Sequence, residues 1–196
     1  MEPHIRNEAA KVIGELVDRD QAEFVFDVAA QLPMILLCEL MGVPQERRNE
    51  YFEYANATAN VEFNDKFIED QINLFVLLDD LVKTQRDAPS DTLLSKYLEG
   101  EVDGRKLNDM EITQFFQVLS IAGHETTRNS TAHFVRLMDQ HPDQRALLLE
   151  DLEGRLPNAI EEVLRFSPPV MQFCRTATTD VTVRGVTIPK LSLIHI

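Results

Sequence analysis

The chain has 196 residues, of which 44% are hydrophobic and 27% are charged, and its formal net charge is −14. This composition is typical of a globular protein, and the strong negative charge argues against nucleic acid or anionic lipid as a partner. We expect no membrane span and a cytoplasmic location, because the sequence has no apolar run of about 18 residues and its start, MEPHIRNE, lacks the apolar core of a signal peptide.

Apolar residues at helical spacing predict a mainly α chain up to residue 166. The predicted helices cover residues 6–19, 34–41, 45–60, 65–86, 91–97, 108–140, 142–152 and 157–166. Residues 24–26 fit either a short strand or the start of a helix, and residues 99–106 fit a turn that contains glycine. After a break at Ser167-Pro168-Pro169, alternating apolar residues predict a small β region with short strands at 170–176, 181–183 and 186–188.

The longest predicted helix contains a block of small and polar residues, IAGHETTRN, at positions 121–129. Asn108 can cap the start of this helix while Glu111 pairs with it reciprocally. Apolar residues on either side of the block predict one buried stripe: Ile112, Phe115, Phe116, Val118, Leu119, Phe134, Leu137 and Met138. A glycine inside a helix costs about 1 kcal/mol relative to alanine, and threonine hydroxyls that bond to the preceding turn can bend a helix. The block therefore predicts a functional site on a bent, partly buried helix.

A second pattern lies on the helix before the proline break. Glu162 and Arg165 are three residues apart, so they share a helix face and can form an ion pair. In order along the chain come the A-G-x-E-T block, this E-x-x-R pair, S-P-P and a strand that carries Arg175. This order resembles the cytochrome P450 family of haem-thiolate monooxygenases. The resemblance covers residues 3–190, includes the turns MGVP (41–44) and HPDQ (141–144) typical of bacterial members, and implies the middle portion of the P450 fold.

The resemblance implies a role for each matching residue. Ala122 and Gly123 would open a groove for dioxygen beside a haem, and Glu125 and Thr126 would form the acid–alcohol pair that supplies protons during dioxygen cleavage. Arg175 would bind a haem propionate through charge-assisted hydrogen bonds. Glu162 and Arg165 would form a structural pair that supports the loop carrying the haem ligand.

The implied reaction is hydroxylation of a lipophilic small molecule by one oxygen atom of dioxygen. The cofactor would be haem b, with electrons from NAD(P)H delivered by a ferredoxin or flavoprotein reductase. The run GHETTRN is similar to bacterial enzymes that act on terpenes or steroid side chains. The apolar residues expected to line the substrate pocket are Val118, Ile121, Val170, Met171 and Phe173, beside Ala122.

The family's cysteine loop, F-x-x-G-x-x-x-C-x-G, does not occur in this sequence. The two cysteines, Cys38 and Cys174, have neither its glycines nor metal-ligand spacing, so we expect no metal ligand in this chain. We therefore expect residues 1–190 to be a partial P450 domain from a longer parent, inactive on its own. Residues 191–196, LSLIHI, are what the sequencing-library transposon end CTGTCTCTTATACACATC encodes, so we expect a non-native tail there.

Two alternatives belong to other classes of protein. His124-Glu125 could begin a helical zinc-hydrolase motif, but Arg128 stands where the second histidine is required, and His124 then becomes a variable polar position in the groove. A non-catalytic helical interaction module derived from the same fold would also explain the missing cysteine loop.

Overall fold

The computed structural model describes residues 2–57 and 64–195, and it confirms a mainly α fold with a small β region. The α-helices are α1 (Glu2–Gly14), α2 (Gln31–Met41), α3 (Arg48–Ala57), α4 (Asp65–Asp87), α5 (Leu93–Glu99), α6 (Asp109–Gln140), α7 (Pro142–Glu150) and α8 (Leu152–Phe166). A π-helix, η1 (Val25–Ala29), precedes α2, and a 3₁₀-helix, η2 (Gln45–Arg47), precedes α3. The strands are β1 (Glu101–Val102), β2 (Arg105–Lys106), β3 (Cys174–Thr176), β4 (Val181–Val183), β5 (Val186–Ile188) and β6 (Leu193–His195).

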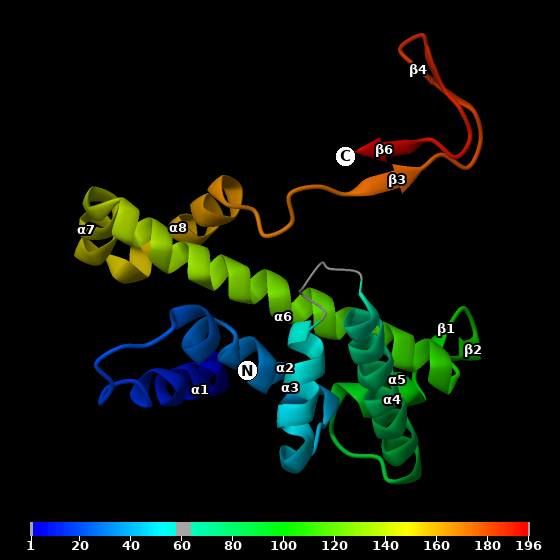
Figure 1. Ribbon diagram of the computed structural model, residues 1–196, viewed down its shortest axis with the longest axis horizontal. Coiled ribbons are helices and arrows are strands. Elements are labelled where there is room, and N and C mark those ends of the chain that lie inside the picture. Colours follow the sequence, from blue (N-terminus) through cyan, green and yellow to red (C-terminus); the bar gives the residue numbers. More distant parts are fainter. Residues whose placement is uncertain (1, 58–63, 196) are drawn as a thin grey trace.

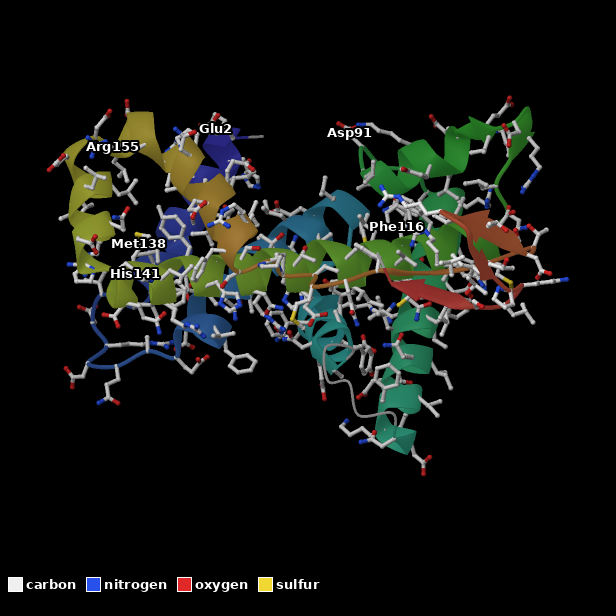
Figure 2. The ribbon with its side chains drawn as sticks, turned by 90° about the horizontal axis from the view of Figure 1, so that it is seen from above. Glu2, Asp91, Phe116, Met138, His141 and Arg155 are labelled. Atoms are coloured by element: carbon white, nitrogen blue, oxygen red, sulfur yellow. The ribbon has the colours of Figure 1, made fainter. Side chains whose placement is uncertain are left out.

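Helix α6 crosses the molecule and separates its other elements (Figure 1). Helices α1–α5 lie on one side of it, while the chain from β3 to β6 lies on the other side. The buried core is formed by α2–α5 against α6, and Figure 2 places Phe116 where α6 passes α4 and α5. Helices α7 and α8 turn back along the carboxyl end of α6. No helix in the described ranges has the length and apolarity needed to cross a membrane.

The ends of α6 confirm the prediction from the sequence. The Asn108 side chain accepts a 2.9 Å hydrogen bond from the Glu111 amide, and the Glu111 carboxylate accepts a 2.9 Å bond from the Asn108 amide. The helix then continues unbroken for 32 residues and ends at Gln140, directly before His141-Pro142. This reciprocal cap satisfies two backbone N–H groups that a helix start leaves without partners.

The buried face of α6 differs from the predicted stripe. Its buried residues are Ile112, Thr113, Phe116, Ser120, His124 and Leu137. Phe115 and Val118 are exposed, so their assignment to the core was wrong. Residues 112, 116, 120 and 124 share one face at four-residue spacing, whereas residues 115 and 118 are rotated away from it. The core therefore continues into the polar block through Ser120 and His124 rather than through aliphatic side chains.

Several predicted boundaries also change. Residues 24–26 are helical, so the strand alternative was wrong, and α1 ends at Gly14 instead of continuing to residue 19. Helix α8 begins at Leu152 because the Asp151 carboxylate caps the Gly154 amide at 3.1 Å, which leaves Pro157 inside the helix. The predicted turn at 99–106 is a hairpin of β1 and β2, turned by Asp103 and Gly104 at positive φ. The predicted helix at 45–60 divides into η2 and α3, and its last three residues lie outside the described residues.

In the β region, β4 and β5 pair as predicted, with Arg184 and Gly185 at positive φ in their turn. The strand predicted from residue 170 begins only at Cys174, and β3 pairs antiparallel with β6. Residues 193–195 thus extend the small β region. The non-native origin of residues 191–196, and the domain limit at residue 190, stay predictions.

Candidate functional site

The polar block of α6 presents Ala122 and Thr126 on the same side of the helix. Ala122 is exposed, Thr126 is half-buried, and the Thr126 hydroxyl donates a 2.7 Å hydrogen bond to the Ala122 carbonyl. This is the back-bonding to the preceding turn that the sequence indicated. The hydroxyl proton is therefore occupied by the helix itself, while the lone pairs of the oxygen can still accept a hydrogen bond from another group.

A pocket of about 560 Å³ lies between α6 and α8 and includes Thr126. Its α6 wall carries four hydroxyls, and its α8 wall is apolar: Thr126, Thr127, Ser130 and Thr131 face Leu156, Ile160, Val163 and Leu164. Each hydroxyl donates to the carbonyl four residues earlier, at 2.7–3.1 Å. The wall thus offers oxygen lone pairs to a ligand, with an aliphatic surface opposite.

The Glu125 carboxylate lies beside an arginine of its own helix. Oε1 of Glu125 is 3.8 Å from Nη2 of Arg128, with side-chain exposures of 35% and 13%, respectively. Arg128 also donates from Nη1 to the Asn56 side chain at the end of α3, at 3.3 Å. Glu125 is therefore held near a positive charge without a direct hydrogen bond to it, since 3.8 Å exceeds hydrogen-bond distance.

Gly123 and His124 face the helical core. A Cβ atom at Gly123 would lie 3.3 Å from Cδ2 of Leu37, so the glycine permits the close approach of α2 to α6. The structure thus gives Gly123 a packing role between α2 and α6. Its place in an oxygen groove stays a prediction.

His124 is 1% exposed, and its ring packs edge-on against Phe52 at a centroid distance of 6.2 Å. Burial lowers the pKa of His124 to about 4, the charge of Arg128 adds to this, and a hydrogen bond with the Ala30 backbone opposes it. The placement of His124 in a groove was wrong. The zinc alternative does not fit either, because this ring lies in the core and the described part of the chain holds no cluster of metal-binding side chains.

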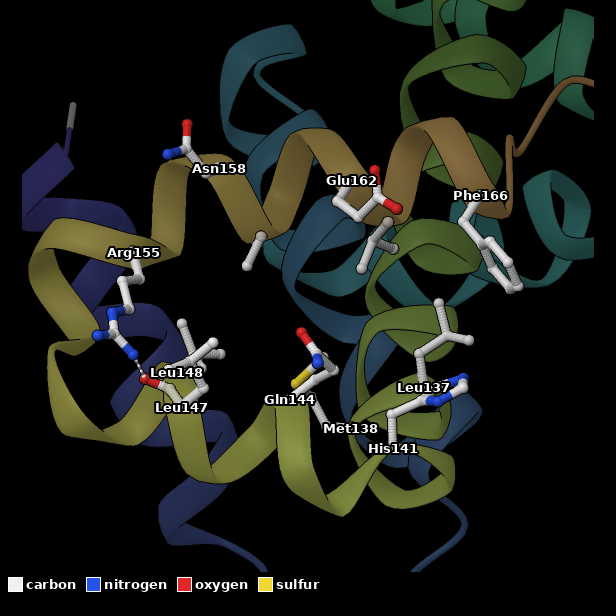
Figure 3. A pocket seen from close by; sticks show the side chains of 12 residues that line it. Leu137, Met138, His141, Gln144, Leu147, Leu148, Arg155, Asn158, Glu162 and Phe166 are labelled. Atoms are coloured by element: carbon white, nitrogen blue, oxygen red, sulfur yellow. Dashed lines mark hydrogen bonds between the residues drawn. The ribbon is translucent and has the colours of Figure 1, made fainter.

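The E-x-x-R pair is formed as predicted. Arg165 donates two hydrogen bonds of 2.7 Å, from Nε and Nη2, to the two carboxylate oxygens of Glu162. These bonds hold the pKa of Glu162 below its usual value. Both side chains are exposed, and Glu162 lines a second pocket of about 450 Å³ between α6, α7 and α8 (Figure 3). The support of a haem-ligand loop by this pair stays a prediction.

The remaining predicted site residues are not brought together. Arg175 on β3 is exposed and donates to its neighbouring carbonyl at 2.9 Å, and β3 stands apart from α6 (Figure 1). Four of the five apolar residues predicted for the substrate pocket are exposed, Ile121 is half-buried, and neither pocket includes any of the five. The haem and substrate roles of these residues stay predictions.

The cysteines differ in environment. Cys38 belongs to the helical core, and burial raises the pKa of its thiol to about 12, so it remains protonated at neutral pH. Cys174 is exposed on β3. A buried thiol of this kind is a poor metal ligand, because the thiolate is the form that binds metals.

Sequence reasoning missed the contacts between α3 and the polar block. Phe52 contacts His124, and Asn56 contacts Arg128. Phe52 and Asn56 are four residues apart on α3, and His124 and Arg128 are four residues apart on α6. The spacing was visible in the sequence. Nothing in it indicated that these two helices lie against each other.

The comparisons with known proteins agree on one family. The family model for cytochrome P450 matches residues 46–196. The chain is 31% identical to the methyl-branched lipid omega-hydroxylase of Mycobacterium tuberculosis, covering 94% of this chain and 45% of that protein. It is 36% identical to the vitamin D(3) 25-hydroxylase of Pseudonocardia autotrophica, covering 96% and 47%.

A solved structure shows the same fold. The chain superposes on a Mycobacterium marinum cytochrome P450 in complex with pseudoionone with a TM-score of 0.87 and 30% identity, covering 99% of this chain and 49% of that one. The chain spans about half the length of the curated relatives it matches.

Proposed function

The chain belongs to the cytochrome P450 family, and from this we propose that the whole protein is a haem monooxygenase that hydroxylates a lipophilic small molecule. One observation carries the proposal. The sequence matches the P450 family model over residues 46–196, and that stretch contains Glu125 and Thr126 as well as the paired Glu162 and Arg165. The relatives named above are hydroxylases.

The residues present are compatible with a haem on the open side of α6. Ala122 is small and exposed there, so a flat ring can approach the helix, and Thr126 lines the adjoining pocket. The exposed guanidinium of Arg175 offers the planar set of donors that suits a carboxylate such as a propionate. Haem, when bound, supplies the iron at which dioxygen is activated. The sulfur ligand is not Cys38, because its thiol is buried and protonated.

Glu125 and Thr126 would transfer protons from solvent into the pocket in this reaction. Thr126 can accept a hydrogen bond from a donor in the pocket while its own proton rests on the Ala122 carbonyl. Turning that proton toward the pocket exchanges one hydrogen bond for another, which costs about 1 kcal/mol or less in net free energy. Glu125 is 35% exposed, so it can take a proton from solvent and pass it inward.

We assign the substrate to the class of lipids and sterol-like molecules with aliphatic branches. The two relatives are named for a methyl-branched lipid and for vitamin D(3), both of which are largely apolar. We also propose that electrons come from NAD(P)H through a ferredoxin or flavoprotein reductase, and that the 196-residue chain alone does not catalyse the reaction.

The test is expression of the whole protein with a haem precursor, followed by the spectrum of its reduced carbon monoxide complex. The expected result is the absorbance band of a thiolate-ligated haem, together with hydroxylated product from a branched-chain lipid or a sterol. Arg165→Ala should abolish haem incorporation, whereas Arg136→Ala, at an exposed position of α6, should not. A folded whole protein that binds no haem would contradict the proposal and favour the interaction-module alternative.

A further inference from the structure

Two successive contacts join α3 to the polar block of α6. Phe52 packs against His124, and Asn56 accepts a hydrogen bond from Arg128. Residues four apart on a helix share one face, so both contacts come from one face of each helix. The carboxyl-terminal part of α3 therefore meets α6 at residues 124–128, the segment that carries Glu125 (Figure 1).

Arg128 is fixed on α6 by neutral groups. Its Nη1 donates to Asn56 at 3.3 Å, and its Nε donates to the Asn129 side chain at 3.3 Å. The Arg128 side chain is 13% exposed, and its guanidinium reaches Glu125 only at 3.8 Å. The arginine is thus held in place from α3, and its charge attracts the carboxylate without bonding it tightly.

We propose that Arg128 is a positioning residue for Glu125, and that α3 sets this position through Asn56. The inference rests on the proposed function, because it concerns the carboxylate that would pass protons to Thr126. A half-exposed glutamate has several rotamers, and a fixed positive charge nearby favours those that keep the carboxylate close. The 3.8 Å gap leaves Glu125 free to rotate between Arg128 and the pocket side of the helix. A shift of α3 would move Arg128 and change which rotamer is favoured.

The experiment uses the whole protein loaded with haem and compares four variants. Arg128→Gln should lower the product formed per NAD(P)H consumed by about tenfold, as expected for a misplaced proton-transfer group. Arg128→Lys, which keeps the charge, should restore part of the loss, and Asn56→Ala should lower the ratio by a few-fold. Arg136→Gln removes an exposed arginine of the same helix and should match the wild type.

Two further readouts separate positioning from a purely structural role. The solvent isotope effect on turnover should rise in Arg128→Gln while haem content and melting temperature stay at wild-type values. A crystal structure of Asn56→Ala should show the guanidinium displaced from Glu125. If Arg128→Gln does not fold, Asn56→Ala decides alone, because it leaves both charges in place.

Wild-type coupling in Arg128→Gln, or an unmoved guanidinium in Asn56→Ala, would overturn the inference. These results differ from a failure of the proposed function. If the proposed function fails, the wild-type protein itself will bind no haem or form no product. The crystal structure of Asn56→Ala will still show whether the Arg128 guanidinium moves away from Glu125.

Discussion

At the scale of single residues, the polar block of α6 divides into side chains that face the pocket and side chains that face the core. Thr126 lines the pocket, while His124 is buried on the opposite side, on the same face as Ser120 just before the block. A block that looks like one functional motif in the sequence therefore serves two purposes. The polarity of this helix has both a chemical and a packing origin.

Thr126→Ala should uncouple electron consumption from product formation in the whole protein. The variant removes the hydroxyl that now bonds to the Ala122 carbonyl and lines the pocket. Losing a proton-transfer group of this kind typically costs a factor of about 10² or more in the step it serves. The measurement is the ratio of product to NAD(P)H consumed, with Thr126→Ser as the matched control that keeps the hydroxyl. Equal ratios in all three proteins would remove Thr126 from the proposed relay.

His124 should make the protein less stable in acid. Its pKa falls from an ordinary value of 6.5 to about 4 in the folded state, so the unfolded chain binds a proton that the folded chain does not. Stability is therefore retained above pH 6.5 and is lost as the pH falls toward 4, by about 3 kcal/mol in free energy of unfolding.

This loss can be isolated by urea unfolding of wild type and His124→Gln in the whole protein at pH 7 and pH 4. The fixed effect of the substitution cancels between the two pH values, as do the other titrating groups. The free energy of unfolding of the variant, relative to that of the wild type, should rise by about 3 kcal/mol between pH 7 and pH 4. A difference that does not change with pH would show that the histidine is not buried as the neutral form.

At the scale of elements, the contact between α2 and α6 depends on Gly123. A Cβ atom there would meet both Cδ atoms of Leu37, at 3.3 and 3.6 Å. Gly123→Val should therefore destabilise the protein by about 1–3 kcal/mol through overpacking. Gly14→Val is the matched control, because a Cβ atom at the end of α1 meets no other atom within 4 Å.

The measurement is the free energy of unfolding of both variants, with Leu37→Ala added to Gly123→Val. The smaller side chain should relieve the crowding, so the two substitutions should cost less together than the sum of their separate effects. Strict additivity would mean that α2 does not approach α6 at this position.

The elements that the sequence predicted well are those with local signals. The cap at Asn108, the end of α6 before Pro142 and the strands β4 and β5 depend on neighbouring residues, and all four were predicted. The pairing of Glu162 with Arg165 is local in the same sense. The family resemblance added the order of the motifs along the chain.

The features that sequence reasoning missed depend on contacts between distant segments. The rotation of α6 that buries Ser120 and His124 and exposes Val118 is set by α2 and α4 packing against it. The link between Asn56 and Arg128 joins residues 72 positions apart. Helical periodicity gives the spacing of a face but not which partner covers it, so it cannot distinguish polar side chains that pack in the core from polar side chains that form a site.

At the scale of the whole molecule, a large apolar surface is exposed for a chain of this size. Met171 is 89% exposed, and Phe166 and Phe173 are each 60% exposed along the connection from α8 to β3. Val118 on α6 is exposed as well, at 64%. Large apolar side chains exposed close together in the chain mark an interface or a tendency to associate.

The 196-residue chain on its own should therefore self-associate, and association should increase with salt. The net charge of −14 makes the copies repel one another, and about 0.15 M salt shortens the range of this repulsion to about 8 Å. The attraction between apolar side chains is not screened, so it prevails at high ionic strength. Sedimentation velocity at low and moderate salt measures the change directly. The double substitution Met171→Lys/Phe173→Lys tests whether these side chains are responsible, and it should reduce association. Lys83→Met/Lys96→Met makes the opposite change at exposed positions of α4 and α5, and it should not reduce association. A monomer at every salt concentration would mean that these side chains are covered in solution in a way that differs from the present structure.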